Sequence, residues 1–226
     1  MILYSTMNQR KEDERIESVV ASYLDKYFYP RFDPKFTRVV NKEMQSNGVD
    51  VIACGKYIDE KVKIRRNLNK VLNGISFEIA RRPWPFKKHT VGWFTSAQII
   101  TNNYLFISVF SSQNREEALC ENNIDHVVCL SVRKDEVYNY LQQTSKDLVN
   151  KSVELGKTAM KLLKEGEEPD WVNKPRVNIN DRCYIVFSWQ IKKELPFNLV
   201  IPREILKQLP GTVEYYCGST GVKKLP

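Results

Sequence analysis

Residues 48–53 (GVDVIA) and 56–64 (KYIDEKVKI) contain the pattern that most restricts how this chain can fold. In both segments, hydrophobic and polar residues alternate, which is typical of half-buried β-strands. The two residues between them, Cys54 and Gly55, are a hairpin signal, although a weaker one than Asn-Gly. The sequence therefore predicts a tight antiparallel hairpin closed by these two residues.

The predicted register brings two acidic residues together. If Cys54 and Gly55 form the turn, Asp50 lies directly opposite Asp59, with Cβ atoms about 4.5–5.5 Å apart on one face. Lys61 points to the same face, because side chains alternate along a strand. The opposite face is the predicted core side, with Glu60 as the exception among its apolar residues, which are Val49, Val51, Ala53, Ile58, Val62 and Ile64.

Two carboxylates placed across a β-ladder repel each other, so this pair needs an explanation. One explanation is a divalent cation between Asp50 and Asp59, and Mg²⁺ prefers such oxygen ligands. Lys61 beside that ion would orient or deprotonate a water molecule, as metal-assisted phosphodiester hydrolysis requires. The alternative is a hairpin whose charges are simply solvated.

The stretch GVDVIACGKYIDEKVKI resembles the P-D…(D/E)-x-K motif of the restriction-endonuclease-like nucleases, and the resemblance covers roughly residues 10–110. It implies that Asp50 and Asp59 are the two motif acids and that Lys61 is the motif lysine. By the same resemblance, the main-chain carbonyl of Glu60 would also bind the metal, and Lys61 would assist the nucleophilic water. Val49 stands where the motif has proline. The implied cofactor is Mg²⁺ or Mn²⁺, and the implied substrate is nucleic acid, with DNA expected rather than RNA.

Three other acidic residues and a glutamine are candidates for the surroundings of this site. Glu78 projects from the polar side of a predicted strand at 75–80 and would become a further metal ligand if that strand lies beside the hairpin. A solvated strand glutamate explains Glu78 equally well. Glu17 either contributes an acid or is an ordinary charge on a helix surface, and the second interpretation is favoured. Glu43 and Gln45 either line the entrance of the site or lie on a helix surface.

Positive charge is concentrated near the hairpin. Ten Lys and Arg residues but three acids lie between Lys56 and Lys88, which gives +7 of the formal net charge of +8. A basic cluster interleaved with aromatic residues is typical of nucleic-acid binding. A soluble lysine-rich face and an acidic protein partner are the alternatives. The residues expected to contact nucleic acid are Arg65, Arg66, Arg81, Arg82, Trp84, Lys87 and Lys88.

The hydrophobic periodicity predicts an α/β fold that forms a single domain over residues 1–226, with a mixed central β-sheet flanked by helices. We expect a nuclease-like core at about 10–132 and a helix and strand-rich C-terminal extension at about 133–226, which offers a possible homodimer surface. The predicted helices are 9–28, 144–164 and a short one beginning at Pro202. The further predicted strands are 75–80, 104–110, 126–132, 183–189 and 197–201.

Composition excludes several other classes. The five cysteines are scattered without a CxxC pair, and the two histidines are too few and too isolated for a Cys/His zinc site. No apolar run approaches the ~18–20 residues of a membrane-spanning helix, and no secretory signal is visible. The sequence therefore predicts a cytoplasmic protein with reduced thiols. A non-catalytic nucleic-acid-binding or protein-interaction module remains the alternative to the nuclease.

Overall fold

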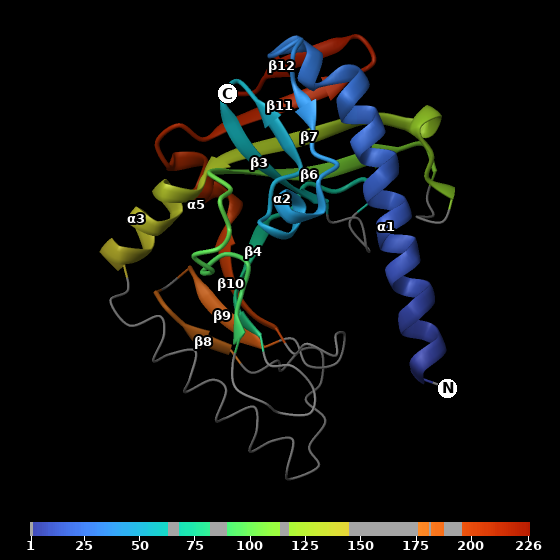
Figure 1. Ribbon diagram of the computed structural model, residues 1–226. Helices are drawn as coiled ribbons and strands as arrows, with labels where there is room; N and C mark the ends of the chain where they lie inside the picture. The colour runs from blue at the N-terminus through green and yellow to red at the C-terminus, as the bar shows by residue number, and fades with distance from the viewer. Residues whose placement is uncertain are drawn as a thin grey trace. The chain divides into compact units, whose positions relative to one another are not determined.

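The computed structural model describes residues 2–62, 68–81, 90–113, 118–144, 176–180, 182–187 and 196–226 (Figure 1). The protein is a mixed α/β protein with a curled seven-stranded mixed sheet, a smaller five-stranded sheet and few helices. Contacts divide the chain into two compact units that each draw on separate segments. The first comprises Met1–Leu72, Thr101–Lys134 and Pro210–Pro226, and the second comprises Asn73–Ile100 and Asp135–Leu209.

The seven-stranded sheet belongs to the first unit and has the order β1-β2-β3-β6-β7-β11-β12. Neighbouring strands are antiparallel except β3 and β6, which are parallel and make the sheet mixed. The strands are β1 (Thr37–Arg38), β2 (Val51–Ala53), β3 (Lys56–Val62), β6 (Asn103–Ser111), β7 (Ile124–Arg133), β11 (Val213–Gly218) and β12 (Gly221–Lys224).

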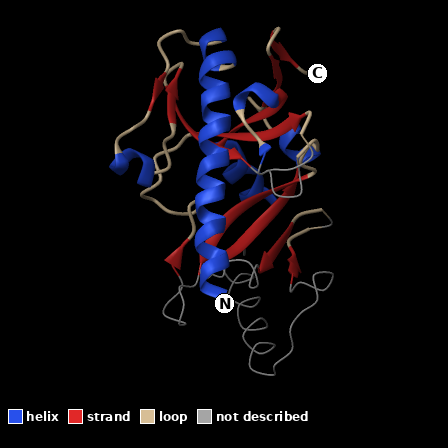
Figure 2. Ribbon diagram, turned by 90° about the vertical axis from the view of Figure 1, so that its right-hand side faces the viewer, coloured by secondary structure: helices blue, strands red, loops and turns tan. Residues whose placement is uncertain are grey.

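Helix α1 (Ile2–Tyr27) lies across this sheet (Figures 1 and 2). It contains most of the predicted helix 9–28 and begins earlier. Its apolar stripe, spaced three and four residues apart, packs against buried side chains of β2, β6 and β7. The stripe consists of Ile16, Val20, Tyr23 and Leu24. The chain then passes through the short helices η1 (Tyr29–Arg31) and α2 (Lys42–Ser46), and η3 (Glu121–Asn123) precedes β7.

The second unit contains the five-stranded sheet, ordered β5-β4-β10-β9-β8 and antiparallel throughout. Helix α5 begins directly after Pro202, as predicted. The expected helix 144–164 lies outside the described residues except for Thr144. The elements are β4 (Gly74–Arg81), β5 (Thr90–Val91), β8 (Arg176–Asn178), β9 (Tyr184–Phe187), β10 (Pro196–Pro202), α3 (Lys134–Thr144) and α5 (Arg203–Gln208).

The strand assignments are largely confirmed, but the expectation of one central sheet is wrong. The predicted strands 104–110 and 126–132 pair with each other in the large sheet, whereas 75–80 and 197–201 pair with each other in the small one. Strand β11, from the expected C-terminal extension, pairs with β7 in the large sheet. Strand partners are set by non-local contacts, which the local alternation pattern does not encode.

Candidate functional site

The hairpin predicted from the sequence is present. Val51 pairs with Ile58 and Ala53 with Lys56, so the two strands have the expected register. Both turn residues, Cys54 and Gly55, adopt positive φ angles, of 50° and 70°. This combination is that of a two-residue type I′ turn, whose twist matches the twist of paired strands.

Asp50 does not lie in the expected position, because β2 begins one residue later, at Val51. The Asp50 amide donates to the carbonyl of Ile58, the residue that already pairs with Val51, so the ladder is irregular at this point. The Asp50 carboxylate accepts a hydrogen bond from the main-chain N–H of Glu60 at 2.8 Å. The prediction that Asp50 lies directly opposite Asp59 in the ladder is therefore wrong: Asp50 lies just before β2, at the edge of β3.

The two aspartates nevertheless lie close together. The Asp50 carboxylate is near enough to Asp59 to act on its pKa, and Asp59 is 3% exposed. Burial raises the pKa of Asp59 to about 7, with Lys61 opposing the shift and Asp50 adding to it. Two carboxylates this close repel each other, and either a proton or a divalent cation compensates their charge.

Lys61 lies beside Asp59, as the alternation along β3 predicts. Its Nζ atom is 2.7 Å from Oδ1 of Asp59. Lys134, at the start of α3, also acts on this carboxylate: burial lowers the pKa of Lys134, and the nearby Asp59 charge opposes that shift. Lys134 was not identified from the sequence, because nothing local distinguishes it among 35 Lys and Arg residues.

The donor set fits a magnesium ion. Two carboxylates are available, from Asp50 and Asp59. The N–H and C=O of one strand residue point to the same side, so the Glu60 carbonyl faces the strand edge where its N–H meets Asp50. Mg²⁺ is commonly bound by one or two carboxylates together with waters and substrate phosphate. In the part of the chain that the structure describes, no three His, Cys, Asp or Glu side chains form a metal-binding group.

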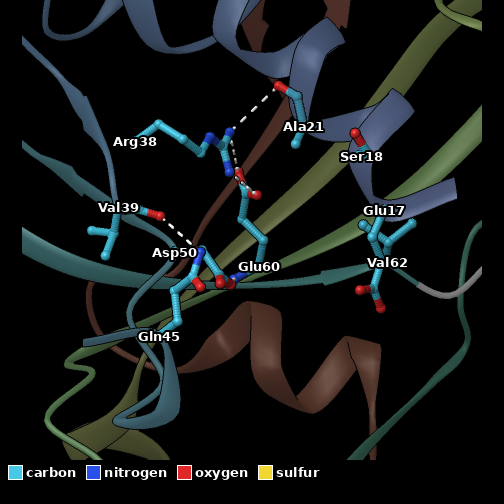
Figure 3. Close-up of a pocket in the computed structure, with 9 residues that line it drawn as sticks. All are labelled: Glu17, Ser18, Ala21, Arg38, Val39, Gln45, Asp50, Glu60 and Val62. Carbon is cyan, nitrogen blue, oxygen red and sulfur yellow. Dashed lines mark hydrogen bonds and ion pairs between the residues drawn. The ribbon is translucent and has the colours of Figure 1, made fainter. Parts of the chain in front are cut away.

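A cavity of about 210 Å³ adjoins Asp50 (Figure 3). Glu17 lines it from α1 and Gln45 from α2, so Gln45 lies near the site as one of its two interpretations predicted. Glu17 is within electrostatic range of the site: partial desolvation in the cavity wall raises its pKa, Lys61 opposes the shift and Asp50 adds to it. The remaining lining residues are Ser18, Ala21, Arg38, Val39, Glu60 and Val62.

Glu60, the exception on the predicted core face, has a buried carboxylate held by specific partners. Arg38 Nη1 lies 2.5 Å from Glu60 Oε2, and the Tyr29 hydroxyl donates to Oε1 at 2.6 Å. Burial raises the pKa of Glu60, while Arg38 and Tyr29 oppose the shift. An acid among apolar residues signals a buried partner, but the sequence alone does not say which cation provides it.

The position of Glu78 removes the premise on which its role as a metal ligand depended. Glu78 lies in β4, which pairs with β5 and β10 in the small sheet. The neighbours of β3 are β2 and β6. The strand of Glu78 is therefore not a hydrogen-bonded neighbour of the hairpin in one sheet. Glu78 is also 7% exposed, which differs from the expected solvated glutamate.

Of the seven predicted nucleic-acid contacts, one lies among the described residues. Arg81 ends β4, and nothing is described of its side chain. The other predicted residues lie outside the described residues, and they are Arg65, Arg66, Arg82, Trp84, Lys87 and Lys88. All five cysteines are free thiols. Among the described helices, none has the length and apolar character needed to cross a membrane.

The raised pKa of Asp59 predicts how the metal-free protein responds to pH. Between about pH 4 and pH 7, the folded state holds a proton on Asp59 that the unfolded chain has lost, because the unfolded pKa is ~3.9. Stability should therefore fall as the pH rises through this window, by an amount on the order of a few kcal/mol, and level off above pH 7. Thermal melts in EDTA from pH 4 to pH 8 measure this slope.

Asp59→Asn provides the comparison for these melts. The variant has no titrating group at position 59, so its melting temperature should change less over the same pH window. Glu17 and Glu60 also have raised pKa values and contribute equally to both proteins. Equal slopes in the two proteins would show that Asp59 does not titrate in this range.

The chain was also compared with known proteins. No family model matches it, and no curated protein or solved structure matches it either.

Proposed function

We propose that this protein is a Mg²⁺-dependent nuclease that hydrolyses phosphodiester bonds, with DNA as the expected substrate. The observation that carries the proposal is that two acids and a lysine gather at one strand: Asp50 accepts from the Glu60 N–H at 2.8 Å, and Lys61 Nζ lies 2.7 Å from the neighbouring Asp59. Asp50, Asp59 and Lys61 have the spacing of the nuclease motif, and all three lie in or directly beside one hairpin. We also propose that α1, β2, β3, β6 and β7 form a restriction-endonuclease-like core.

Each residue has a distinct role in this proposal. Asp50 and Asp59 supply the negative charge that holds the cation, and the Glu60 carbonyl offers a third oxygen. When bound, Mg²⁺ stabilises charge on the phosphate and lowers the pKa of a coordinated water. Lys61 would orient the attacking water as a hydrogen-bond donor, since its ammonium group lies beside Asp59.

The charge distribution supports a polyanionic substrate. The segment Lys56–Lys88 contributes +7 to a chain of net charge +8, and it includes the second hairpin strand with Asp59 and Lys61. Phosphate contacts made by Lys and Arg supply most of the salt-dependent affinity of nucleic-acid binding. A site built to cut nucleic acid needs such positive charge around an acidic centre that would otherwise repel the substrate.

A digestion assay tests the proposal. Plasmid DNA, single-stranded DNA and RNA are incubated with the protein in Mg²⁺, in Mn²⁺ and in EDTA, beside Lys61→Ala protein purified identically. We expect cleavage that requires the metal and is absent from the Lys61→Ala preparation. A gel shift in EDTA without cleavage in either metal would favour the non-catalytic nucleic-acid-binding module, and neither binding nor cleavage would reject both functions.

A further inference from the structure

The side of β3 that faces away from Lys61 carries a second cluster of charged side chains. The Glu60 side chain is 8% exposed, and both of its carboxylate oxygens have partners. Oε1 accepts from the Tyr29 hydroxyl at 2.6 Å and from Arg38 Nη2 at 3.2 Å, and Oε2 lies 2.5 Å from Arg38 Nη1. This carboxylate is therefore held in one orientation.

Arg38 connects Glu60 to helix α1 (Figure 3). Its Nη2 atom lies 2.5 Å from Oδ1 of Asp25 and donates to the carbonyl of Ala21 at 3.4 Å. Its Nε atom donates to both Asp25 carboxylate oxygens at 3.1 Å. The Arg38 guanidinium group also lies over the Tyr29 ring, 5.8 Å from its centre. One guanidinium group thus joins α1, β1 and β3.

The backbone of Glu60 leads from this cluster to the proposed metal site. Its N–H donates to Oδ2 of Asp50 at 2.8 Å. Its C=O faces the same strand edge, because the N–H and C=O of a strand residue point to one side. The side chain of Glu60 is fixed on one face, and its main chain fixes the orientation of Asp50 at the edge.

We infer that Tyr29, Arg38 and Glu60 form a positioning clamp that sets the Asp50 carboxylate and the Glu60 carbonyl in the geometry for a divalent cation; this inference rests on the proposed function. In this inference the three side chains supply no metal ligand, although Arg38 and Glu60 line the cavity beside Asp50. They act through the Glu60 main chain, as groups behind the ligands of metal sites commonly do.

Stability alone does not account for this cluster. Ile58 and Val62, on either side of Glu60 along the same face, pack against the hydrophobic core. An apolar residue at position 60 would extend that face without the desolvation cost of a buried ion pair, which is often no more stabilising than well-packed apolar residues. The charge is instead placed at the one strand position whose N–H holds Asp50.

A pair of matched tyrosine variants tests the clamp. Tyr29→Phe removes the hydroxyl that holds Glu60. Tyr23→Phe removes a hydroxyl from the same core, where Tyr23 donates to the Cys217 carbonyl at 3.5 Å, away from Glu60. Mn²⁺ binding to each full-length protein is measured by electron paramagnetic resonance, without substrate. We expect Tyr29→Phe to bind Mn²⁺ roughly 10-fold more weakly than wild type and Tyr23→Phe to bind it normally.

Cleavage kinetics supply a second readout that a purely structural role would not change. In Tyr29→Phe, the Mn²⁺ concentration giving half-maximal cleavage should rise roughly 10-fold, while kcat at saturating Mn²⁺ stays within a few-fold of wild type. Arg38→Lys, which keeps the charge but not the bidentate geometry, should weaken Mn²⁺ binding further. If Arg38→Lys does not fold, the tyrosine pair decides the question.

The outcomes separate this inference from the proposed function. Equal Mn²⁺ affinity in Tyr29→Phe and Tyr23→Phe, with wild-type cleavage intact, would overturn the clamp alone. A wild-type protein that binds no Mn²⁺ and cleaves nothing would overturn both the proposed function and the clamp.

Discussion

Lys61→Ala should lower the rate of nucleic-acid cleavage by about 10²–10⁴-fold while leaving divalent-cation affinity close to wild type. This is the scale of general acid–base catalysis, and Lys61 supplies no metal ligand in the proposed site. Its ammonium group lies 2.7 Å from Asp59 Oδ1 and carries positive charge, so its removal should not weaken cation binding. Single-turnover cleavage and Mn²⁺ titration measure the two properties separately.

Lys56→Ala is the matched control for this variant. Lys56 lies on the same strand and is exposed, at a position that alternates to the other face from Lys61. The Lys56→Ala protein should cleave nucleic acid at nearly the wild-type rate when the two proteins are compared at saturating substrate. If Lys61→Ala cleaves as fast as Lys56→Ala, Lys61 has no catalytic role.

Asp50→Asn should reduce metal affinity and cleavage together, because it removes one of the two carboxylates proposed to hold the cation. The asparagine side-chain oxygen can still accept the hydrogen bond from the Glu60 N–H, so the local fold should be kept. Removing the charge also lowers repulsion toward Asp59, whose pKa is raised partly by Asp50. The metal-free variant should therefore be as stable as wild type, or up to about 1 kcal/mol more stable.

Thermal melts with and without Mg²⁺ test whether Asp50→Asn keeps the stability of the metal-free protein but loses the stabilisation by Mg²⁺. At a metal concentration 100-fold above Kd, wild type should gain about 5–10 °C in Tm and Asp50→Asn much less. Asp125→Asn, at an exposed position of β7, is the control and should respond like wild type. The account would be contradicted if Asp50→Asn melted several degrees below wild type and Mg²⁺ did not stabilise the wild type. The aspartate pair would then have a structural role only.

The sequence predicted the local structure around the site well. The alternation across Cys54-Gly55 determined the strands, their turn and the register of Val51 with Ile58. These features depend on residues adjacent in the chain. The position of Asp50 was less predictable. It depends on where β2 begins and on the hydrogen bond that the Asp50 carboxylate accepts from the Glu60 N–H.

Non-local pairings account for the predictions that were wrong or missing. The pattern at 75–80 identified a strand correctly, but its partner is β10, more than a hundred residues away in the chain. Glu60 stood out as an acid on an apolar face, yet its partners Arg38 and Tyr29 approach from elements without a sequence signature. Pairings between distant segments depend on tertiary packing, and a single sequence does not reveal it.

The most direct test of the proposed site is the position of a bound cation in the protein itself. Crystals of the full-length protein soaked in Mn²⁺ would be measured for anomalous scattering from the metal. The proposal predicts a peak bound by carboxylate oxygens of Asp50 and Asp59 and by the Glu60 carbonyl, with Lys61 beside it. A map at high Mn²⁺ concentration with no peak between the two aspartates would contradict it.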